Sequence, residues 1–197
     1  MIVYEANKRE FLDHVDKDVP VTHILNQFEL KLGRTSESEI RSWDISMLHM
    51  YRVLNDQTIP DDAGVAIEYR TPYTSKRVNF LLPGHDGETD SVVIVELKQW
   101  SEVQKVEGKE AIVKTAINRD LHEVTHPSYQ AWSYAALIED YNENVQEQLI
   151  QLKPCAYLHN YRIRENDPLT DKHYGDEVPD PQCGNALLHW GLAPISK

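Results

Sequence analysis

The fold of this chain is decided by two neighbouring runs, Arg77-Val-Asn-Phe-Leu-Leu-Pro83 and Val92-Val-Ile-Val-Glu-Leu-Lys98. Each run is short, apolar and flanked by turn-forming residues, a pattern that predicts two strands of an antiparallel pair. The first run contains one carboxamide, Asn79, and the second ends in Glu96 and Lys98. A strand turns residues i and i+2 to the same face, so a carboxylate and an ammonium are expected to project together.

A regular order of strands extends from these two runs. Strands are expected at about residues 64–70, 77–82 and 91–98, with connections short enough for an antiparallel meander. A further strand is expected from Pro154 to Tyr161. The polar segment 101–123 predicts a hairpin or a loop.

Helices are expected before and after the meander. Two short helices are predicted within residues 1–34, and Ser38 is a suitable N-cap for a longer helix that runs to Leu54. Pro127 is expected in the first turn of a helix whose apolar face ends at Tyr141. The order helix, three strands, helix, strand predicts an α/β layered domain with a mixed central sheet flanked by helices.

The composition is that of an ordinary globular chain. Its 197 residues are 41% hydrophobic and 26% charged, which is enough apolar material to build the core of one domain. We expect that domain to occupy residues 1–161. Residues 162–197 are rich in Pro, Asp and Gly with little periodicity, and are expected to form an irregular C-terminal appendage of the same domain.

The sequence has no feature typical of a membrane protein or a secreted protein. The chain has no apolar run of about 18 residues, so no membrane span is expected. The first ten residues lack the order of charges and apolar residues that a signal peptide requires. Cys155 and Cys183 are too few and too isolated for a disulfide framework or a zinc site. A cytoplasmic location is therefore expected.

The formal net charge of −12 counts against a surface dominated by nonspecific attraction to nucleic acid. It leaves room for a local basic patch around Lys76 and Arg77, to which Lys98 and Lys114 could add. Part of the acidic excess could equally belong to a cation-binding site.

Glu96 and Lys98 suit metal-assisted phosphodiester hydrolysis. In such chemistry a carboxylate holds a divalent cation, while a lysine steadies or deprotonates the attacking water. A Glu-x-Lys triplet is a loose motif, however, because both residues are common. The alternative is a solvated strand end that carries a simple ion pair.

Five segments taken together carry a family resemblance: SESEIRSW, DDAGVAIEY, TSKRVNFLL, VVIVELKQW and THPSYQAWSYAALIEDYNENV. They resemble the PD-(D/E)XK nuclease superfamily and, more closely, the nuclease-like domain that precedes Schlafen-type helicase domains in bacterial proteins. The resemblance covers roughly residues 1–161. It implies a restriction-endonuclease-like α-β-β-β-α-β core from about residue 38 to residue 161, with extra helices at the N-terminus.

The resemblance also implies the roles of individual residues. Glu96 would be a metal ligand, the carbonyl of Leu97 would face the metal, and Lys98 would lie near the nucleophilic water. Gln130 and Tyr134 form a Q-x-x-x-Y pair similar to the extra motif of RecB-like nucleases. Because residues i and i+4 share one face of a helix, both side chains could reach the same cleft.

An acidic residue from outside these strands commonly completes such a site. Glu39, near the start of the helix before the meander, is one candidate, and Glu68 on the first strand is the other. Glu39 could instead serve the helix N-terminus through its dipole. Glu68 alternates with Ala66 and Arg70 on one strand face, so it could simply point to solvent.

Asn79 is the position at which the chain departs from the family pattern, which has a metal-binding aspartate there. Asparagine keeps a carbonyl oxygen but loses the negative charge. Magnesium relies on one or two carboxylates in sparse protein sites, so weaker metal binding and low or absent cleavage are expected. The sequence leaves open whether the asparagine is natural or was introduced deliberately.

The leading expectation is a domain that hydrolyses DNA with Mg²⁺ or Mn²⁺, in defence or repair, with Lys76, Arg77 and Lys114 binding the nucleic acid. A second expectation is a catalytically silent nuclease fold that binds nucleic acid or a protein. A third is a purely structural interaction domain, which would follow if the basic residues lay on separate surfaces. Partners could include a separate helicase-type ATPase or a second copy of the chain.

Overall fold

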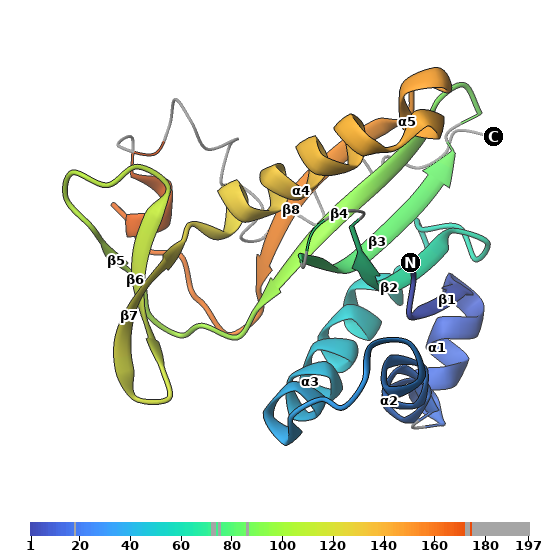
Figure 1. Cartoon of the computed structure of the whole chain (residues 1–197), viewed down its shortest axis with the longest axis horizontal. Helices are drawn as coiled ribbons and strands as arrows, with labels where there is room; N and C mark the ends of the chain where they lie inside the picture. The colour runs from blue at the N-terminus through green and yellow to red at the C-terminus, as the bar shows by residue number, and fades with distance from the viewer. Residues whose placement is uncertain (18, 72–73, 75, 86, 172–173, 175–197) are drawn as a thin grey trace.

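The strands of the meander form the centre of a mixed α/β arrangement, shown in Figure 1. The computed structural model describes residues 1–17, 19–71, 74, 76–85, 87–171 and 174, with the backbone alone for 19–21 and 31–32. Over this part of the chain, no helix has the length and apolar character needed to cross a membrane.

The elements before the second sheet are β1 (Tyr4–Asn7), α1 (Lys8–Asp16), α2 (Val19–Leu32), α3 (Glu37–Leu54), β2 (Gly64–Arg70), β3 (Arg77–His85) and β4 (Asp90–Lys98). Those that follow are β5 (Gln104–Lys105), β6 (Ile112–Ile117), β7 (Asp120–Thr125), α4 (Pro127–Tyr141), α5 (Glu143–Glu147), β8 (Gln151–Leu158) and the 3₁₀ helix η1 (Pro168–Thr170).

The main sheet has five described strands in the order β1-β2-β3-β4-β8. Neighbouring strands from β1 to β4 are antiparallel, whereas β8 is parallel to β4. The connection from β4 to β8 contains α4, as a crossover between parallel strands requires. The predicted meander and the predicted mixed sheet are both confirmed.

Helices cover both faces of this sheet (Figure 1). On one face α1, α2 and α3 bury a cluster that includes Phe11, Trp43 and Phe80. On the other face α4 packs against a second cluster that includes Ile94 and Tyr134. The sheet is therefore the middle layer of three, and its apolar residues are buried from both sides.

Two expectations about element ends and one about burial were wrong. The N-cap of α3 is Ser36 rather than Ser38, because the Ser36 side chain accepts a hydrogen bond from the Glu39 backbone N–H. Tyr141 ends α4 and is 54% exposed, since the helix runs past its buried contacts there. The last strand ends at Leu158, before Tyr161.

A second sheet of three described strands, β5-β6-β7, stands at one end of the main sheet (Figure 1). Its β6–β7 pair is the hairpin predicted within 101–123. Leu169 and Tyr174 are buried against this sheet and β8, so the described part of the C-terminal segment packs on the domain. Cys183 and the rest of 175–197 lie outside the described residues.

His126 joins this C-terminal segment to α4. Its ring is fully buried, and Nδ1 accepts a hydrogen bond from the Ser128 backbone N–H, which caps the helix. Nε2 therefore carries the proton and donates to the Leu169 carbonyl at 3.2 Å. Burial lowers the pKa of His126 from 6.5 to about 4, because the charged ring would lose its hydration.

We predict that His126 makes folding sensitive to acid. Between pH 6.5 and about 4 the unfolded chain binds a proton that the folded chain does not, so stability falls as pH falls. The full shift corresponds to roughly 3 kcal/mol. His126→Asn keeps a helix-capping side chain but does not titrate, so its urea-unfolding free energy should vary less with pH across this window.

The matched control is His122→Asn, which removes an exposed histidine of β7 and should leave the pH slope unchanged. Burial raises the pKa of Glu68 and Glu96, which gives stability the opposite dependence on pH, but both variants retain these glutamates. Equal pH slopes for the parent and His126→Asn would contradict the prediction.

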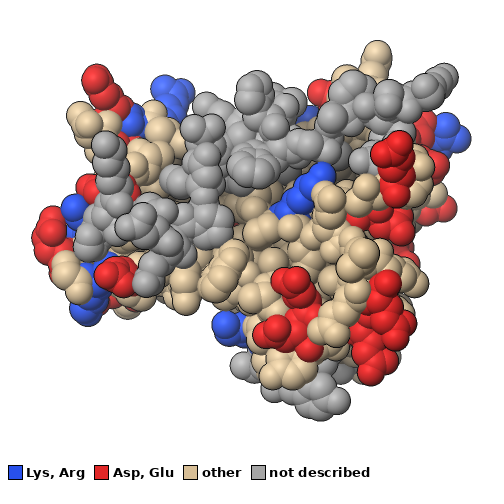
Figure 2. All heavy atoms as spheres, turned by 90° about the horizontal axis from the view of Figure 1, so that it is seen from above, with Lys and Arg blue, Asp and Glu red and all other residues tan. Residues whose placement is uncertain are grey.

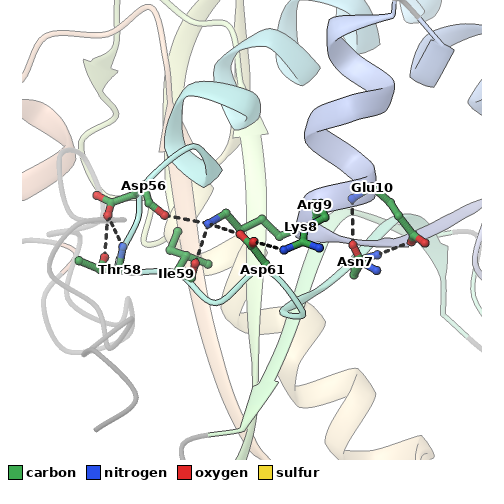
Figure 3. Close-up of polar contacts among 8 residues, drawn as sticks. All are labelled: Asn7, Lys8, Arg9, Glu10, Asp56, Thr58, Ile59 and Asp61. Carbon is green, nitrogen blue, oxygen red and sulfur yellow. Dashed lines mark hydrogen bonds and ion pairs between the residues drawn. The ribbon is translucent and has the colours of Figure 1, made fainter. Parts of the chain in front are cut away.

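Lys8 holds the segment between α3 and β2 against the start of α1, as Figure 3 shows. Its side chain is almost fully buried, and Nζ donates to the carbonyls of Asp56 at 2.9 Å and Ile59 at 2.6 Å. The same nitrogen lies 3.4 Å from Asp61 Oδ1. One ammonium thus satisfies three oxygens of a segment that has no strand or helix of its own.

Lys8→Met should therefore destabilise the fold, because it leaves the buried Ile59 carbonyl without its donor. We expect a loss of about 2 kcal/mol in the free energy of unfolding, measured in urea. Arg9→Met removes the same charge from an exposed side chain that also pairs with Asp61, and should cost much less. Equal losses in the two variants would show that charge, rather than buried hydrogen bonding, determines the effect.

Candidate functional site

A cavity of about 360 Å³ opens where the meander meets α3 and α4. Five elements contribute polar side chains to it: Glu39 (α3), Glu68 (β2), Arg77 and Asn79 (β3), Glu96 (β4), and Gln130 and Tyr134 (α4). The cavity therefore brings together residues from 39 to 134 that only the folded chain places side by side.

The register of the sheet places three of these side chains in one row. In the register of β2 and β3, Glu68 stands opposite Asn79. The strands pair on either side of these two residues, but the pairing is interrupted at them. Continuing the β3–β4 register by one residue puts Asn79 opposite Glu96. Asn79 therefore stands between two carboxylates on the neighbouring strands.

The backbone at Glu68 explains why this row faces the cavity. Glu68 has a φ of +53°, in the left-handed region that side-chain-bearing residues rarely adopt. Ala66 and Tyr69, three residues apart, both pack in the α4-side cluster, so the regular alternation of β2 is broken between them. The alternative that Glu68 simply points to solvent was wrong for this reason.

Glu68 is a buried carboxylate, only 3% exposed. Oε1 accepts a hydrogen bond from Trp43 Nε1 at 3.1 Å, and Oε2 lies 3.2 Å from an Arg77 nitrogen. Burial raises the pKa of Glu68, while the Arg77 charge and the bonds from Trp43 and Asn79 oppose that rise. No pattern in the sequence indicates this contact of Trp43.

Buried Glu96 and half-buried Lys98 form an ion pair, with Lys98 Nζ 2.8 Å from Glu96 Oε1. Glu96 and Lys98 do project together, as predicted from the strand period. The alternative of a solvated strand end was wrong, because Glu96 is only 3% exposed. Burial raises the pKa of Glu96, and the charge and hydrogen bond of Lys98 oppose that rise. The second carboxylate oxygen of Glu96, Oε2, is buried and has no hydrogen-bond partner among the described residues.

Gln130 connects the ion pair to α4. Its Oε1 accepts a hydrogen bond from Lys98 at 3.0 Å, and its Nε2 donates to Glu96 Oε1 at 2.9 Å. Nε2 also lies 2.7 Å from the Tyr134 hydroxyl oxygen. Burial, helped by the Glu96 charge, raises the pKa of Tyr134 to about 12, so Tyr134 stays a neutral hydroxyl.

Asn79 is held by the neighbouring strand. Its Oδ1 accepts a hydrogen bond from the Leu97 backbone N–H at 3.1 Å. One of the two lone pairs of this carbonyl oxygen is therefore used by the backbone of β4. Leu97 itself lines the cavity.

Glu39 and Arg77 close the cavity on the α3 side. Arg77 Nη2 lies 2.6 Å from Glu39 Oε1, and the Thr35 hydroxyl donates to Glu39 Oε2 at 2.5 Å. Glu39 thus points to the site, although its position in the first turn of α3 also suits the helix dipole. The two roles proposed for Glu39 are compatible.

The basic residues expected to contact nucleic acid divide into two places. Lys76 and Arg77 line the same cavity, and Lys76 lies 5.9 Å from the centre of the Tyr134 ring. Lys114 is on β6 in the second sheet, 3.8 Å from Glu123. Figure 2 shows groups of acidic side chains on the face that it draws, with basic side chains scattered between them.

The donors around Asn79 fit a hard divalent cation in part. The buried Glu96 Oε2 is an oxygen that a cation could use, and Glu68 supplies a second carboxylate nearby in the row. The described residues nevertheless contain no group of three or more His, Cys, Asp or Glu side chains that could hold a metal ion. Position 79 lies between the two glutamates, so a carboxylate there would add a third acidic side chain to the row.

Comparisons with known proteins add no assignment: no protein-family model, no curated protein and no solved structure matches this chain.

The site geometry predicts strong coupling between Glu96 and Lys98. Lys98→Met leaves a buried carboxylate without its cation and should cost about 3 kcal/mol of unfolding free energy. Adding Glu96→Gln removes the stranded charge, so the double variant should recover most of that loss. A double-mutant cycle in urea measures the coupling, and strictly additive effects of the two single changes would contradict the prediction.

Proposed function

We propose that this chain is a nuclease-type domain that hydrolyses phosphodiester bonds in DNA with Mg²⁺ or Mn²⁺, and that Asn79 impairs its cleavage. The observation that carries the proposal is the ion pair of buried Glu96 with Lys98, held by Gln130 beside Asn79 in one cavity. A carboxylate at a strand end can hold a divalent cation, and an ammonium beside it can orient the attacking water.

The order of elements supports the proposal. Once β5–β7 and α5 are set aside as additions, the order α3, β2, β3, β4, α4, β8 is the one expected of a restriction-endonuclease-like core, which supports the proposal. The parallel pairing of β8 with β4, through the α4 crossover, agrees with that layout. A fold hosts many functions, so the site rather than the layout carries the argument.

A metal would be held by Glu96 and an aspartate at position 79, with Glu68 or Glu39 as the further carboxylate. Such an ion polarises a phosphate and lowers the pKa of a bound water. The part of Lys98 follows from its contacts. Its ammonium has three N–H donors, and among the described residues Glu96 and Gln130 accept two of them, so the third could orient a water or a phosphate oxygen.

The charge of the cavity gives a physical reason for impairment. The carboxylates of Glu39, Glu68 and Glu96 face the cations of Arg77 and Lys98, with Lys76 also lining the cavity. Asn79 adds no charge, so little negative potential is left to attract a divalent cation.

Restoring the carboxylate tests the proposal. We predict that Asn79→Asp cleaves linear, circular or single-stranded DNA in Mg²⁺ or Mn²⁺, on the order of a hundredfold faster than the parent chain. EDTA should abolish that cleavage. Gel analysis of the products under each condition measures the effect and distinguishes cleavage at ends from cleavage within a strand.

The control is the double variant Asn79→Asp with Lys98→Met, whose thermal unfolding is measured beside its activity. A folded double variant should not cleave. If Asn79→Asp binds metal and remains folded but cleaves neither DNA nor RNA, the nuclease proposal fails.

A silent nucleic-acid-binding module is the second candidate, and one observation favours it: most carboxylate oxygens of the cavity already have partners. It predicts DNA binding that is independent of Mg²⁺ in fluorescence anisotropy, with no cleavage after Asn79→Asp. The purely structural reading required the basic residues to lie on separate surfaces. Lys76 and Arg77 instead line one cavity, and Lys98 contacts Glu96 and Gln130 there.

The remaining parts of the proposal concern partners and setting. A separate helicase-type ATPase, a second copy of the chain, a role in phage defence or repair and a cytoplasmic location all stay predictions.

A further inference from the structure

The guanidinium of Arg77 lies between two carboxylates of the cavity, in the place that a bound metal ion would take. One guanidinium nitrogen lies 2.6 Å from Glu39 Oε1, and another lies 3.2 Å from Glu68 Oε2. The two glutamates come from different elements, α3 and β2. A planar guanidinium can bridge them because it presents several donors in a fixed fork.

The surroundings of Arg77 hold it in this position. Its guanidinium carbon lies 4.9 Å from the centre of the Phe28 ring, so α2 supports it through a cation–π contact. The Arg77 side chain is 31% exposed and Glu68 is almost fully buried. Water can therefore reach the arginine, whereas Glu68 is shielded from bulk solvent.

The same cavity has a carboxylate oxygen that Arg77 does not use. Glu96 Oε2 is buried and has no partner among the described residues. A divalent cation that enters would have this oxygen as an anchor, whereas Glu39 and Glu68 are engaged with Arg77. The arginine and the cation would thus compete for the same two carboxylates.

We propose that Arg77 is an internal counter-ion that sets the affinity of this cavity for divalent cations by occupying Glu39 and Glu68. The proposal rests on the proposed function in one respect, namely that the cavity takes a divalent cation. It adds that Arg77, which lies outside the Glu-x-Lys pair, limits metal binding. Displacing Arg77 would free the carboxylates of Glu39 and Glu68 for the metal.

The test compares Arg77→Met with Lys76→Met in the full chain by calorimetric titration with Mn²⁺. Each variant removes one positive charge from the lining of the same cavity, but Lys76 is exposed and only Arg77 bridges the two carboxylates. We expect roughly tenfold tighter Mn²⁺ binding for Arg77→Met, and little change for Lys76→Met because water screens an exposed charge.

Thermal unfolding provides a second readout. Arg77→Met leaves Glu68 buried without its cation, so its unfolding temperature should fall in EDTA. Mn²⁺ should raise that temperature more than it does in the parent chain, because the ion replaces the missing charge. Arg77→Lys keeps the charge but loses the planar fork, and should give an intermediate Mn²⁺ affinity.

A reversal variant completes the design. Glu39→Gln combined with Arg77→Met should return the Mn²⁺ affinity toward that of the parent, because one of the released carboxylates is gone. Equal affinities for Arg77→Met and Lys76→Met would overturn the proposal, as would an unchanged affinity in both Arg77→Met and Arg77→Lys.

The outcomes separate this inference from the nuclease proposal. If Asn79→Asp cleaves DNA but Arg77→Met binds Mn²⁺ no better than the parent, the counter-ion role alone fails. If Arg77→Met gains affinity while a folded Asn79→Asp cleaves nothing, the nuclease proposal fails and the counter-ion role stands.

Discussion

Burial of carboxylates at the ends of the central strands is the constraint on which the rest of this structure depends. Glu68 and Glu96 are almost completely removed from water, and an unpaired charge in such a place would cost several kcal/mol. Each therefore has a cation beside it, Arg77 for Glu68 and Lys98 for Glu96. Gln130 then fixes the Lys98 pair to α4, so the arrangement of the layers and the arrangement of the charges depend on each other.

The same pairing governs what the cavity can do. An ion pair that stabilises the fold also uses the oxygens that a metal would need, and Asn79 supplies no charge to shift that balance. If the cavity takes a metal as proposed, stability and metal binding would therefore be opposed. The free Oε2 of Glu96 is the exception, because the folded structure tolerates one buried oxygen without a partner in the described residues.

Much of the fold could be predicted from the sequence because its central strands are locally distinct. The bounds predicted for β2 agree with the structure, since an apolar run between turn-forming residues leaves little choice. The strand β1 was missed because it has four residues and its pairing partner, β2, lies some sixty residues away along the chain. The α3 cap was misplaced by two residues, because Ser36 and Ser38 are equally good capping residues and only the backbone chooses between them.

The sequence by itself determined that Glu96 and Lys98 share a face, because the period of a strand is local. It also placed Gln130 and Tyr134 together on one face of a helix. Only the tertiary structure decided that Gln130 reaches Lys98, because that contact depends on how α4 packs over β4. It alone decided that Glu68 turns inward to Arg77, because a positive φ interrupts the alternation from which its direction was predicted. Local periodicity can be read along the chain, whereas burial and pairing of charge depend on contacts between residues far apart in it.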